Sequence, residues 1–181
     1  GNPPPSDTSQ NNPRIKAGYT FLGQFIDHDL TLDTTSVLQQ QIDVEGSRNF
    51  RTPVLELDSL YGLGMAAQPS LYDRNNPGRF LLSDSGNDLP RNSQGSALIG
   101  DPRNDENILV SQLHLLFLKF HNKVFNEHTD TSLGTTARFE AAQKLVRWHY
   151  QWIVVNEFLP RIVGNQNVKK LLKATELPFP D

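Results

Sequence analysis

The feature that most constrains the fold of this chain is a helical repeat of apolar residues that follows Asp105. The repeat has spacings of three and four, in the series Leu109, Leu113, Leu116, Phe117, Phe120 and Val124. Such spacing places the apolar side chains on one face of an α-helix, where they can be buried together. The pattern predicts a helix of about 20 residues, with Asn104 or Asp105 as its N-cap and Asp105 and Glu106 near the positive end of its dipole.

Weaker helical patterns occupy residues 15–30, 136 to about 158, and 167–174. The second of these begins at a candidate cap, Thr135 or Thr136, and is followed by Pro160 and Gly164, which predict its end. Its apolar side is expected to carry Leu145, Trp148, Trp152, Val155 and Phe158.

Residues 33–100 are dense in Gly, Pro, Asn and Asp, with short apolar pieces at 54–57, 80–82 and 97–99. This composition predicts loops and at most a small β-hairpin. Residues 1–14, rich in Pro and Asn, are expected to form an extended arm that resembles neither a signal peptide nor a natural start. The predicted fold class is mainly α, with a long loop between the first two long helices, and loops of that length often carry a site.

The composition of the 181 residues excludes several classes of partner. The net charge is −3, and the 17 Lys and Arg residues form no run longer than Lys169-Lys170, so no nucleic-acid surface is expected. No apolar run approaches the roughly 18 residues of a membrane span. The chain contains no cysteine, so any metal must take oxygen or imidazole ligands, and the redox compartment is left undecided.

The run Gly18–Leu30 holds one histidine between two carboxylates. On a helix with about 100° per residue, Gln24, Asp27 and His28 share one face, while Asp29 points roughly a quarter turn away. His28 and Gln24 could therefore serve one site and Asp29 another. A lone histidine is more often a satisfied core residue, so both readings stay open on this run alone.

Four separated motifs resemble the animal-type haem peroxidases, the superfamily of myeloperoxidase, peroxinectin and the cyclooxygenases. They are QFIDHD at 24–29, TPVLELDSLYG at 52–62, GDPRNDE at 100–106 and the segment 114–122. The resemblance implies a helical haem peroxidase core, with residues 15–181 as its N-terminal, distal-side part. It also implies haem b as cofactor, and an enzyme that reduces hydrogen peroxide while oxidising halide or small organic donors.

Carried over by this resemblance, His28 corresponds to the distal histidine that moves a proton between the oxygens of peroxide. Arg103 corresponds to the arginine that stabilises charge on the leaving oxygen, and Gln24 to the glutamine that holds water or halide. These residue types suit O–O heterolysis, which needs a group titrating near neutral pH and a cation. Asp27 and Glu106 correspond to acids that can form esters with haem methyl groups on peroxide turnover. Asn107 stands where myeloperoxidase has a methionine bonded to a haem vinyl group, so this third link to haem is not expected.

The resemblance also implies a calcium site on the far side of the first helix. Asp29 would be one ligand, and the segment 52–58 would supply the Thr52 side chain and carbonyl, the Val54 carbonyl, Glu56 and Asp58. Alternating oxygens suit a hard cation that takes six to eight of them. Glu56 stands where the family usually has Asp, and Asp58 where it often has Ser.

The remaining histidines have plainer interpretations. His114 and His121 lie seven apart and are expected to be hydrogen-bonded packing residues, and His128 a surface residue near a helix end. His149, beside Trp148, is tempting as an iron ligand, but it lies inside the third helix and is not expected to bind iron. Tyr61 is expected to pack rather than to carry a radical.

The proximal half of the haem site, with its iron-binding histidine, is not expected within these residues. The resemblance implies a further polypeptide segment or chain that supplies it, and we expect the isolated chain not to give normal histidine-ligated haem. Three alternative functions are carried forward. They are a haem fatty-acid dioxygenase, a non-catalytic binding domain of the same fold, and a His-Asp metal-dependent phosphohydrolase. The phosphohydrolase would require His114, His121 or His128 to converge on His28. The family resemblance favours a secreted or extracellular location, which the sequence itself leaves unknown.

Overall fold

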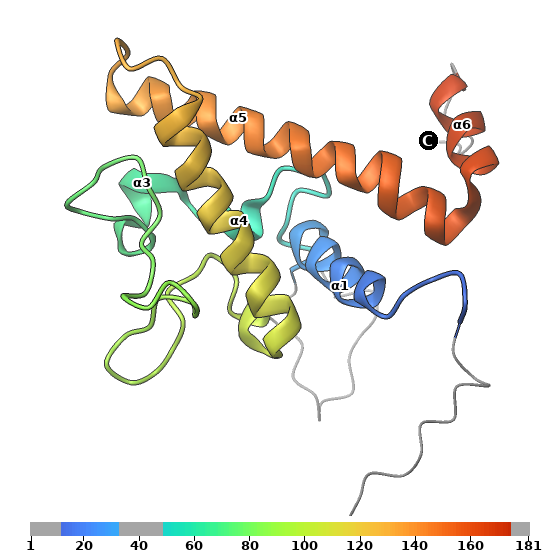
Figure 1. Cartoon of the computed structure of the whole chain (residues 1–181), viewed down its shortest axis with the longest axis horizontal. Helices are drawn as coiled ribbons and strands as arrows, with labels where there is room; N and C mark the ends of the chain where they lie inside the picture. Colours follow the sequence, from blue (N-terminus) through green and yellow to red (C-terminus); the bar gives the residue numbers. More distant parts are fainter. Residues whose placement is uncertain (1–11, 33–48, 175–181) are drawn as a thin grey trace, which may run out of the picture.

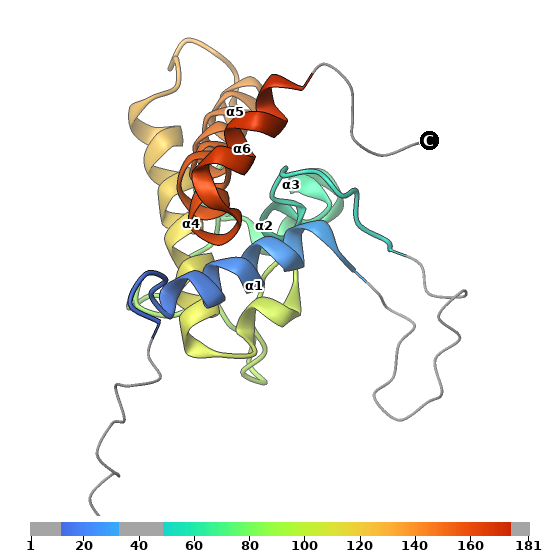
Figure 2. The same ribbon diagram turned by 90° about the vertical axis from the view of Figure 1, so that its right-hand side faces the viewer.

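The computed structural model describes residues 12–32 and 49–174 and is mainly helical (Figure 1). Two long helices, α4 (Ile108–Glu127) and α5 (Thr135–Ile153), are joined by a short loop and pack against each other. The third main helix, α1 (Gly18–Leu30), packs against α4 and against the segment that follows α5. Figure 2 shows α1 lying across α4, with the short helices beyond its C-terminal half.

Short helices lie beside the long ones, and two of them contact both α1 and α4. The short helices are α2 (Asp58–Tyr61), α3 (Gly64–Ala67) and two 3₁₀ helices, η3 (Pro69–Leu71) and η4 (Pro102–Asp105). Among the described residues the only β-structure is two isolated antiparallel bridges, Tyr72 with Phe80 and Arg91 with Ala97. Of the predicted loop region, residues 49–100 are confirmed as mostly irregular, with three helices of three or four residues, and the bridges use two of its short apolar pieces. Residues 33–48 of that region lie outside the described residues. The predicted arm at 1–14 lies outside the described residues except for its last three positions.

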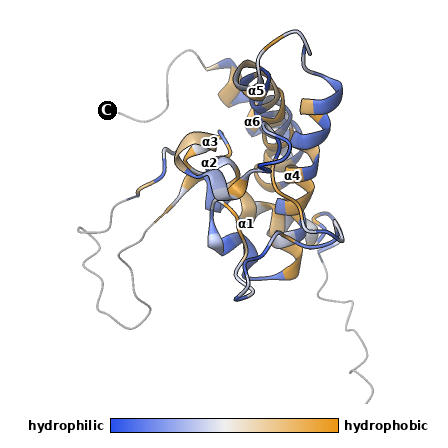
Figure 3. Ribbon diagram, turned by 90° about the vertical axis from the view of Figure 1, so that its left-hand side faces the viewer, coloured by the Kyte–Doolittle hydropathy of each residue, from blue (hydrophilic) through white to orange (hydrophobic). Residues whose placement is uncertain are grey.

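The helix predicted after Asp105 is confirmed, but its cap and its buried face differ from the prediction. The N-cap is Asn107, whose side chain accepts a hydrogen bond from the Val110 N–H at 3.0 Å. Leu109 and Leu116 are 49% and 60% exposed. The buried face is turned by one position and includes Val110, Ser111, His114, Leu115, Phe117, Leu118, His121, Val124 and Phe125. Figure 3 shows apolar residues recurring along α4.

The α5 helix likewise buries a different stripe from the predicted one. Trp148 and Trp152 are 55% and 57% exposed, because the stripe that meets α4 and α1 consists of Phe139, Ala142, Val146 and Tyr150. The cap prediction was wrong as well, since Gly134 precedes the helix and makes no side-chain cap bond. A neighbouring element, rather than the strongest apolar pattern, decided which side is buried.

The end of α5 continues in a wider helix instead of stopping near Pro160. Residues Val154–Phe158 and Pro160–Gly164 form two π-helical segments, labelled η5 and η6, before α6 (Asn165–Lys173). A wider turn tolerates a proline that lacks an N–H and crowds the preceding carbonyls. None of the helices in the described ranges is both long enough and apolar enough to cross a bilayer.

Candidate active site

The last turn of α1 directs its polar side chains toward two different parts of the chain. His28 is 5% exposed and Asp29 is fully buried, whereas Asp27 is exposed. His28 contacts Asn104 in η4, while Asp29 accepts a hydrogen bond from the Leu57 N–H at 3.1 Å. The predicted separation of His28 from Asp29 is therefore confirmed as geometry.

On the first side, three buried side chains from three elements are connected in series. His28 Nδ1 lies 2.8 Å from Asn104 Oδ1, and Asn104 Nδ2 lies 2.9 Å from His114 Nδ1. Asn104 and His114 are fully buried. Burial lowers the pKa of His114 to about 3, so this ring is neutral near neutral pH. The series links α1 to α4 through η4.

The η4 turn forms because Asp101 caps it and Pro102 opens it. The Asp101 carboxylate accepts from the Arg103 N–H at 3.0 Å and is itself nearly fully buried. Burial acts to raise the pKa of Asp101, but hydrogen bonds from Arg103 and Arg51 outweigh it and hold that pKa below its usual value. Gly100, just before, fits only as glycine because a Cβ would lie 2.6 Å from the Ser59 carbonyl oxygen.

Arg103 ties η4 to the end of α1. Its Nε and Nη2 donate to Asp101, and Nη2 also donates to the carbonyls of His28 at 3.1 Å and Thr31 at 2.5 Å. Within the described residues, Nη1 has no bonded partner. The Asp101 carboxylate raises the pKa of Arg103, and the nearby charges of Asp27 and Glu106 act in the same direction.

The structure therefore brings Asp27, His28, Arg103 and Glu106 to one junction between α1 and η4. Asp27 and Glu106 are exposed there, and their carboxylates bond to no other described residue.

Gln24, one turn before His28, joins the same junction through Asn107. Gln24 Oε1 accepts a hydrogen bond from Asn107 Nδ2 at 3.1 Å. Because Asn107 Oδ1 caps α4, the amide of Asn107 is fixed at both ends, and it leaves the Gln24 amide nitrogen as a free donor. Asn107 thus orients Gln24.

On the second side of α1, several buried polar atoms have no hydrogen-bond partner in the described part of the chain. They are Asp29 Oδ1, Ser59 Oγ and the Tyr150 hydroxyl. Burial raises the pKa of Asp29, while the Leu57 and Ser59 N–H groups and the nearby Tyr150 hydroxyl act to lower it and the charge of Asp58 acts to raise it. The Tyr150 hydroxyl is therefore close to the Asp29 carboxylate, although the two form no well-aligned hydrogen bond. Leu57, which donates to Asp29, has a φ of +60° and is the N-cap residue of α2. A buried carboxylate oxygen without a partner is the kind of atom that a cation can satisfy.

The other predicted calcium ligands are only partly gathered around Asp29. Thr52 and Val54 are exposed, and their carbonyls accept from the N–H groups of Val54 and Glu56, at 2.8 and 2.9 Å. Asp58 Oδ1 lies 4.0 Å from Arg147 Nη2. Across residues 12–32 and 49–174, no group of three or more Asp, Glu, His or Cys side chains has the geometry to hold a metal.

Of the remaining histidines, His121 is a buried packing residue, whereas His128 and His149 are exposed. His121 is fully buried between the Tyr61 hydroxyl and the Gly78 carbonyl, each 3.0 Å away, which also confirms Tyr61 as a packing residue. His128 is exposed at the end of α4. His149 is exposed and bonds to the Leu145 carbonyl of its own helix. His114 approaches His28 only through the intervening Asn104 amide, and neither His121 nor His128 converges on it. Because the described residues also hold no group of three such side chains able to bind a metal, they lack the arrangement required of a phosphohydrolase.

Sequence reasoning missed the roles of Asn104, Asp101 and Asn107. Asn104 was assigned to a helix cap, yet it is the side chain that bonds His28. Its position next to Arg103 in the motif GDPRNDE was the available signal, because a residue beside a site residue in a tight turn faces the same junction.

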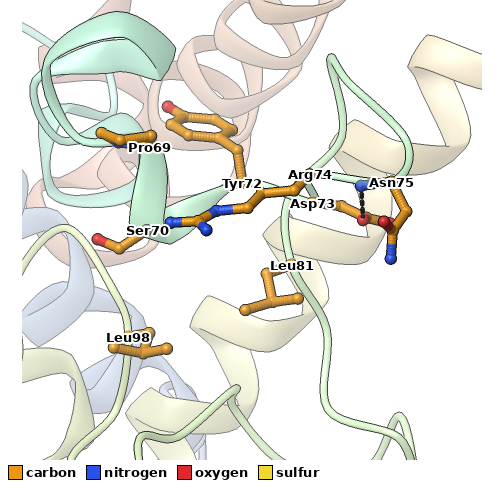
Figure 4. A pocket seen from close by; sticks show the side chains of 8 residues that line it. All are labelled: Pro69, Ser70, Tyr72, Asp73, Arg74, Asn75, Leu81 and Leu98. Carbon is orange, nitrogen blue, oxygen red and sulfur yellow. Dashed lines mark hydrogen bonds between the residues drawn. The ribbon is translucent and has the colours of Figure 1, made fainter.

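A separate hollow of about 370 Å³ lies on another part of the surface, beside η3 (Figure 4). Its lining includes Ser70, Arg74 and Leu98, and the Asn75 N–H donates to Asp73 Oδ1 at 2.8 Å on its rim. None of the candidate residues of either side of α1 lines it, so we do not assign it to the site.

Comparison with known proteins places these features in a family. The family model described as animal haem peroxidase matches residues 43–177, a range that contains Arg103 and Glu106 but not α1. A peroxidase-like protein of Margaritifera margaritifera is 36% identical over 69 residues, which are 37% of this chain and 9% of that protein. The peroxidasin homolog pxn-2 of Caenorhabditis elegans is 28% identical over 153 residues, which are 77% of this chain and 11% of that protein.

Solved structures show the same fold. The fatty acid alpha-dioxygenase of Arabidopsis thaliana superposes with a TM-score of 0.67 at 19% identity, over 86% of this chain and 29% of that one. The corresponding enzyme of Oryza sativa gives 0.66 at 19% identity, over 84% of this chain and 30% of that one. The chain thus spans less than a third of these structures and 9–16% of the peroxidase relatives.

Proposed function

This chain belongs to the animal haem peroxidase family, and we propose that it supplies the peroxide-binding side of a haem site. The reaction would reduce hydrogen peroxide and oxidise halide ions or small organic donors. The observation that carries the proposal is the junction of α1 and η4, where His28, Arg103, Asp27 and Glu106 meet. A base and a cation in one place suit O–O cleavage, which develops negative charge on the leaving oxygen.

The atoms left open at this junction fit a haem. In the described ranges, no group bonds to His28 Nε2, to Arg103 Nη1 or to the carboxylates of Asp27 and Glu106. Asp27 and Glu106 would hold the rim of the macrocycle, by hydrogen bonds or by ester bonds. Haem, when bound, would supply the iron that takes up peroxide and the oxidising equivalents for the donor. The iron-binding histidine would come from a further polypeptide segment.

Each residue of the junction has a separate task in this proposal. His28 Nε2 would accept the proton from the inner oxygen of peroxide and return it to the outer one. Arg103 is anchored through Nε and Nη2, so Nη1 would donate to the oxygen that becomes negative. The Gln24 amide, held by Asn107, would bind water or a halide ion with its free nitrogen.

A calcium ion on the second side of α1 is part of the same proposal. The unpartnered Asp29 Oδ1 and the nearby charge of Asp58 support two of its ligands. Glu56 and the carbonyls of Thr52 and Val54 would have to turn toward the ion when it binds. The expected role of calcium is to fix the segment 52–58 against α1 and so to hold the last turn of α1 in place.

A fatty-acid dioxygenase is the second candidate, because the solved structures with this fold include two fatty acid alpha-dioxygenases. Both candidates place the same residues at the junction. They differ in substrate, since a dioxygenase consumes molecular oxygen with a fatty acid, and a peroxidase consumes peroxide with a small donor. Measuring both consumptions on one preparation separates them.

The direct test uses the full-length protein that contains this chain, loaded with haem. We expect stoichiometric haem by absorbance and peroxide-dependent oxidation of a small donor. His28→Ala should retain haem and lose about 10²- to 10⁴-fold in peroxide reactivity, the usual value of a positioned proton-transfer group. His149→Ala is the matched control, since that exposed histidine bonds only within its own helix. Equal activity of His28→Ala and His149→Ala would remove the assigned role.

A further inference from the structure

We propose that Asn104 and His114 are positioning residues that hold His28 in one tautomer, with its proton on Nδ1 and its lone pair on Nε2. The consequence for catalysis rests on the proposed function, whereas the tautomer itself does not. The proposal assigns a task to two buried residues that the peroxide chemistry does not otherwise use.

The geometry supplies an unbroken polar series between three elements. His28 Nδ1 is 2.8 Å from Asn104 Oδ1, and Asn104 Nδ2 is 2.9 Å from His114 Nδ1. His28 is 5% exposed and the other two are fully buried, so water does not compete for these bonds. The backbone of Asn104 is fixed as well, because its N–H donates to the Asp101 carbonyl at 3.1 Å.

An amide between two imidazoles couples their tautomers. The oxygen of Asn104 only accepts and its nitrogen only donates. With the oxygen toward His28, Nδ1 of His28 must carry the proton, and Nδ1 of His114 must be a lone pair. A rotated amide would reverse both assignments. Exactly one of the two neutral rings can therefore carry its proton on Nδ1.

The orientation with the oxygen toward His28 leaves the open atom of each ring in a different setting. His28 Nε2 is then a lone pair that faces no bonded group among the described residues, as a proton acceptor requires. His114 Nε2 then carries a hydrogen and has no polar partner in the described part of the chain. It belongs to a ring in edge contact with Phe25, whose centroid is 6.3 Å away. The unsatisfied group is thus placed in the core rather than at the junction.

The test is the ¹⁵N signature of the His28 ring in the chain, because a pyridine-like nitrogen resonates far downfield of a pyrrole-like one. Spectra are recorded at mildly alkaline pH, where the rings are neutral, and His28 is identified by loss of its signals in His28→Gln. We expect Nε2 to be pyridine-like and Nδ1 pyrrole-like, with a tautomer ratio of about tenfold, the value of one net hydrogen bond.

Variants of the series separate positioning from general stability. His114→Leu removes the acceptor of the Asn104 amide, so the tautomer ratio of His28 should fall toward one. His114→Asn can place an amide oxygen near the former Nδ1 and should restore the ratio. Asn122→Ala is the control, since Asn122 on the same helix bonds only to the Phe80 backbone, and its loss should lower stability without moving the ratio.

Two results would overturn the proposal. One is a wild-type His28 with a pyrrole-like Nε2, and the other is a ratio that His114→Leu leaves unchanged. Asn104→Leu, which removes the amide itself, should also lower the tautomer ratio of His28. If that variant does not fold, the pair His114→Leu and His114→Asn still decides. A correct tautomer in a full-length protein without peroxide turnover would refute the proposed function and leave this inference standing.

Discussion

The two sides of the last turn of α1 differ in how their buried polar atoms are hydrogen-bonded. On the His28 side, buried nitrogen and oxygen atoms are paired in series through Asn104 to His114. On the Asp29 side, Asp29 Oδ1, Ser59 Oγ and the Tyr150 hydroxyl have no partner within the described residues. The bonds that orient His28 are formed before any ligand arrives, although His114 Nε2 on that side also lacks a partner among the described residues. We infer that the other side is completed by a cation.

This difference has a physical meaning for a site that must do chemistry. A paired series fixes side chains in advance and needs no reorganisation when a reaction develops charge. Unpaired buried oxygens cost free energy until a partner binds, so binding there is coupled to stability. The comparison predicts that changes on the His28 side affect reactivity, whereas changes on the Asp29 side affect stability through calcium.

The largest expected effect separates the two sides by activity. In the full-length, haem-loaded protein, His28→Ala should lower kcat/KM for peroxide by roughly 10²- to 10⁴-fold because it removes the proton acceptor. Asp29→Asn, assayed in the same way with calcium in excess, should lose far less because it lies on the other side. Stopped-flow kinetics with peroxide gives both values. A greater loss in Asp29→Asn would reverse the assignment of the two sides.

The next effect concerns acid stability, to which two buried histidines contribute: His114 on the His28 side, and His121, whose pKa burial lowers to about 4. Burial lowers the pKa of His114 to about 3 in the folded chain, against 6.5 in the unfolded one. The unfolded state therefore binds the proton first, and stability is lost as pH falls below about 6.5, by roughly 3 kcal/mol near pH 4. Denaturant unfolding of the chain between pH 7 and pH 4 measures this.

His114→Asn should remove about half of this acid-induced loss of stability, because an amide does not titrate whereas His121 still does. His128→Asn is the control, because the side chain of His128 is 60% exposed. If the loss of unfolding free energy between pH 7 and pH 4 is as large in His114→Asn as in the wild type, groups other than His114 cause it.

The third effect belongs to the Asp29 side. Calcium that binds only the folded chain should raise its unfolding free energy, by about 2.7 kcal/mol at a hundred times the dissociation constant. Asp29→Asn should abolish the rise by removing the central ligand, and magnesium should be a poorer substitute because it demands a tighter octahedral geometry. Thermal unfolding with and without calcium is the measurement. A rise that persists in Asp29→Asn would place the ion elsewhere.

The smallest effects compare one removal on each side. Asn104→Leu leaves the Nδ1 atoms of His28 and His114 unpaired and should cost about 1–3 kcal/mol. Ser59→Ala removes a hydroxyl that has no partner among the described residues, so without calcium it should change stability by less than about 0.5 kcal/mol. Urea unfolding of both variants gives the contrast, and equal losses would contradict the difference between the two sides.

The local patterns of the sequence predicted much of this arrangement. The spacing of apolar residues placed α4, and the period of a helix separated His28 from Asp29 before any tertiary contact was known. Periodicity did not predict which stripe of α5 is buried. The packing of neighbouring helices determines that stripe, and it leaves Trp148 and Trp152 exposed. Two apolar stripes can satisfy the same helix, and only the neighbouring helix selects one.

The sequence likewise predicted only part of the candidate site. Residue types and motif order pointed to His28, Arg103 and Glu106, because the chemistry of each side chain is fixed by its identity. The local pattern predicts Asn104 as a helix cap, because such a pattern contains no information about a partner 76 positions away in the sequence. Its hydrogen bonds to His28 and His114 form because η4 packs against both α1 and α4. The sequence by itself therefore determined which groups are present and on which helix face they lie, whereas the packing of three elements decided which of them touch.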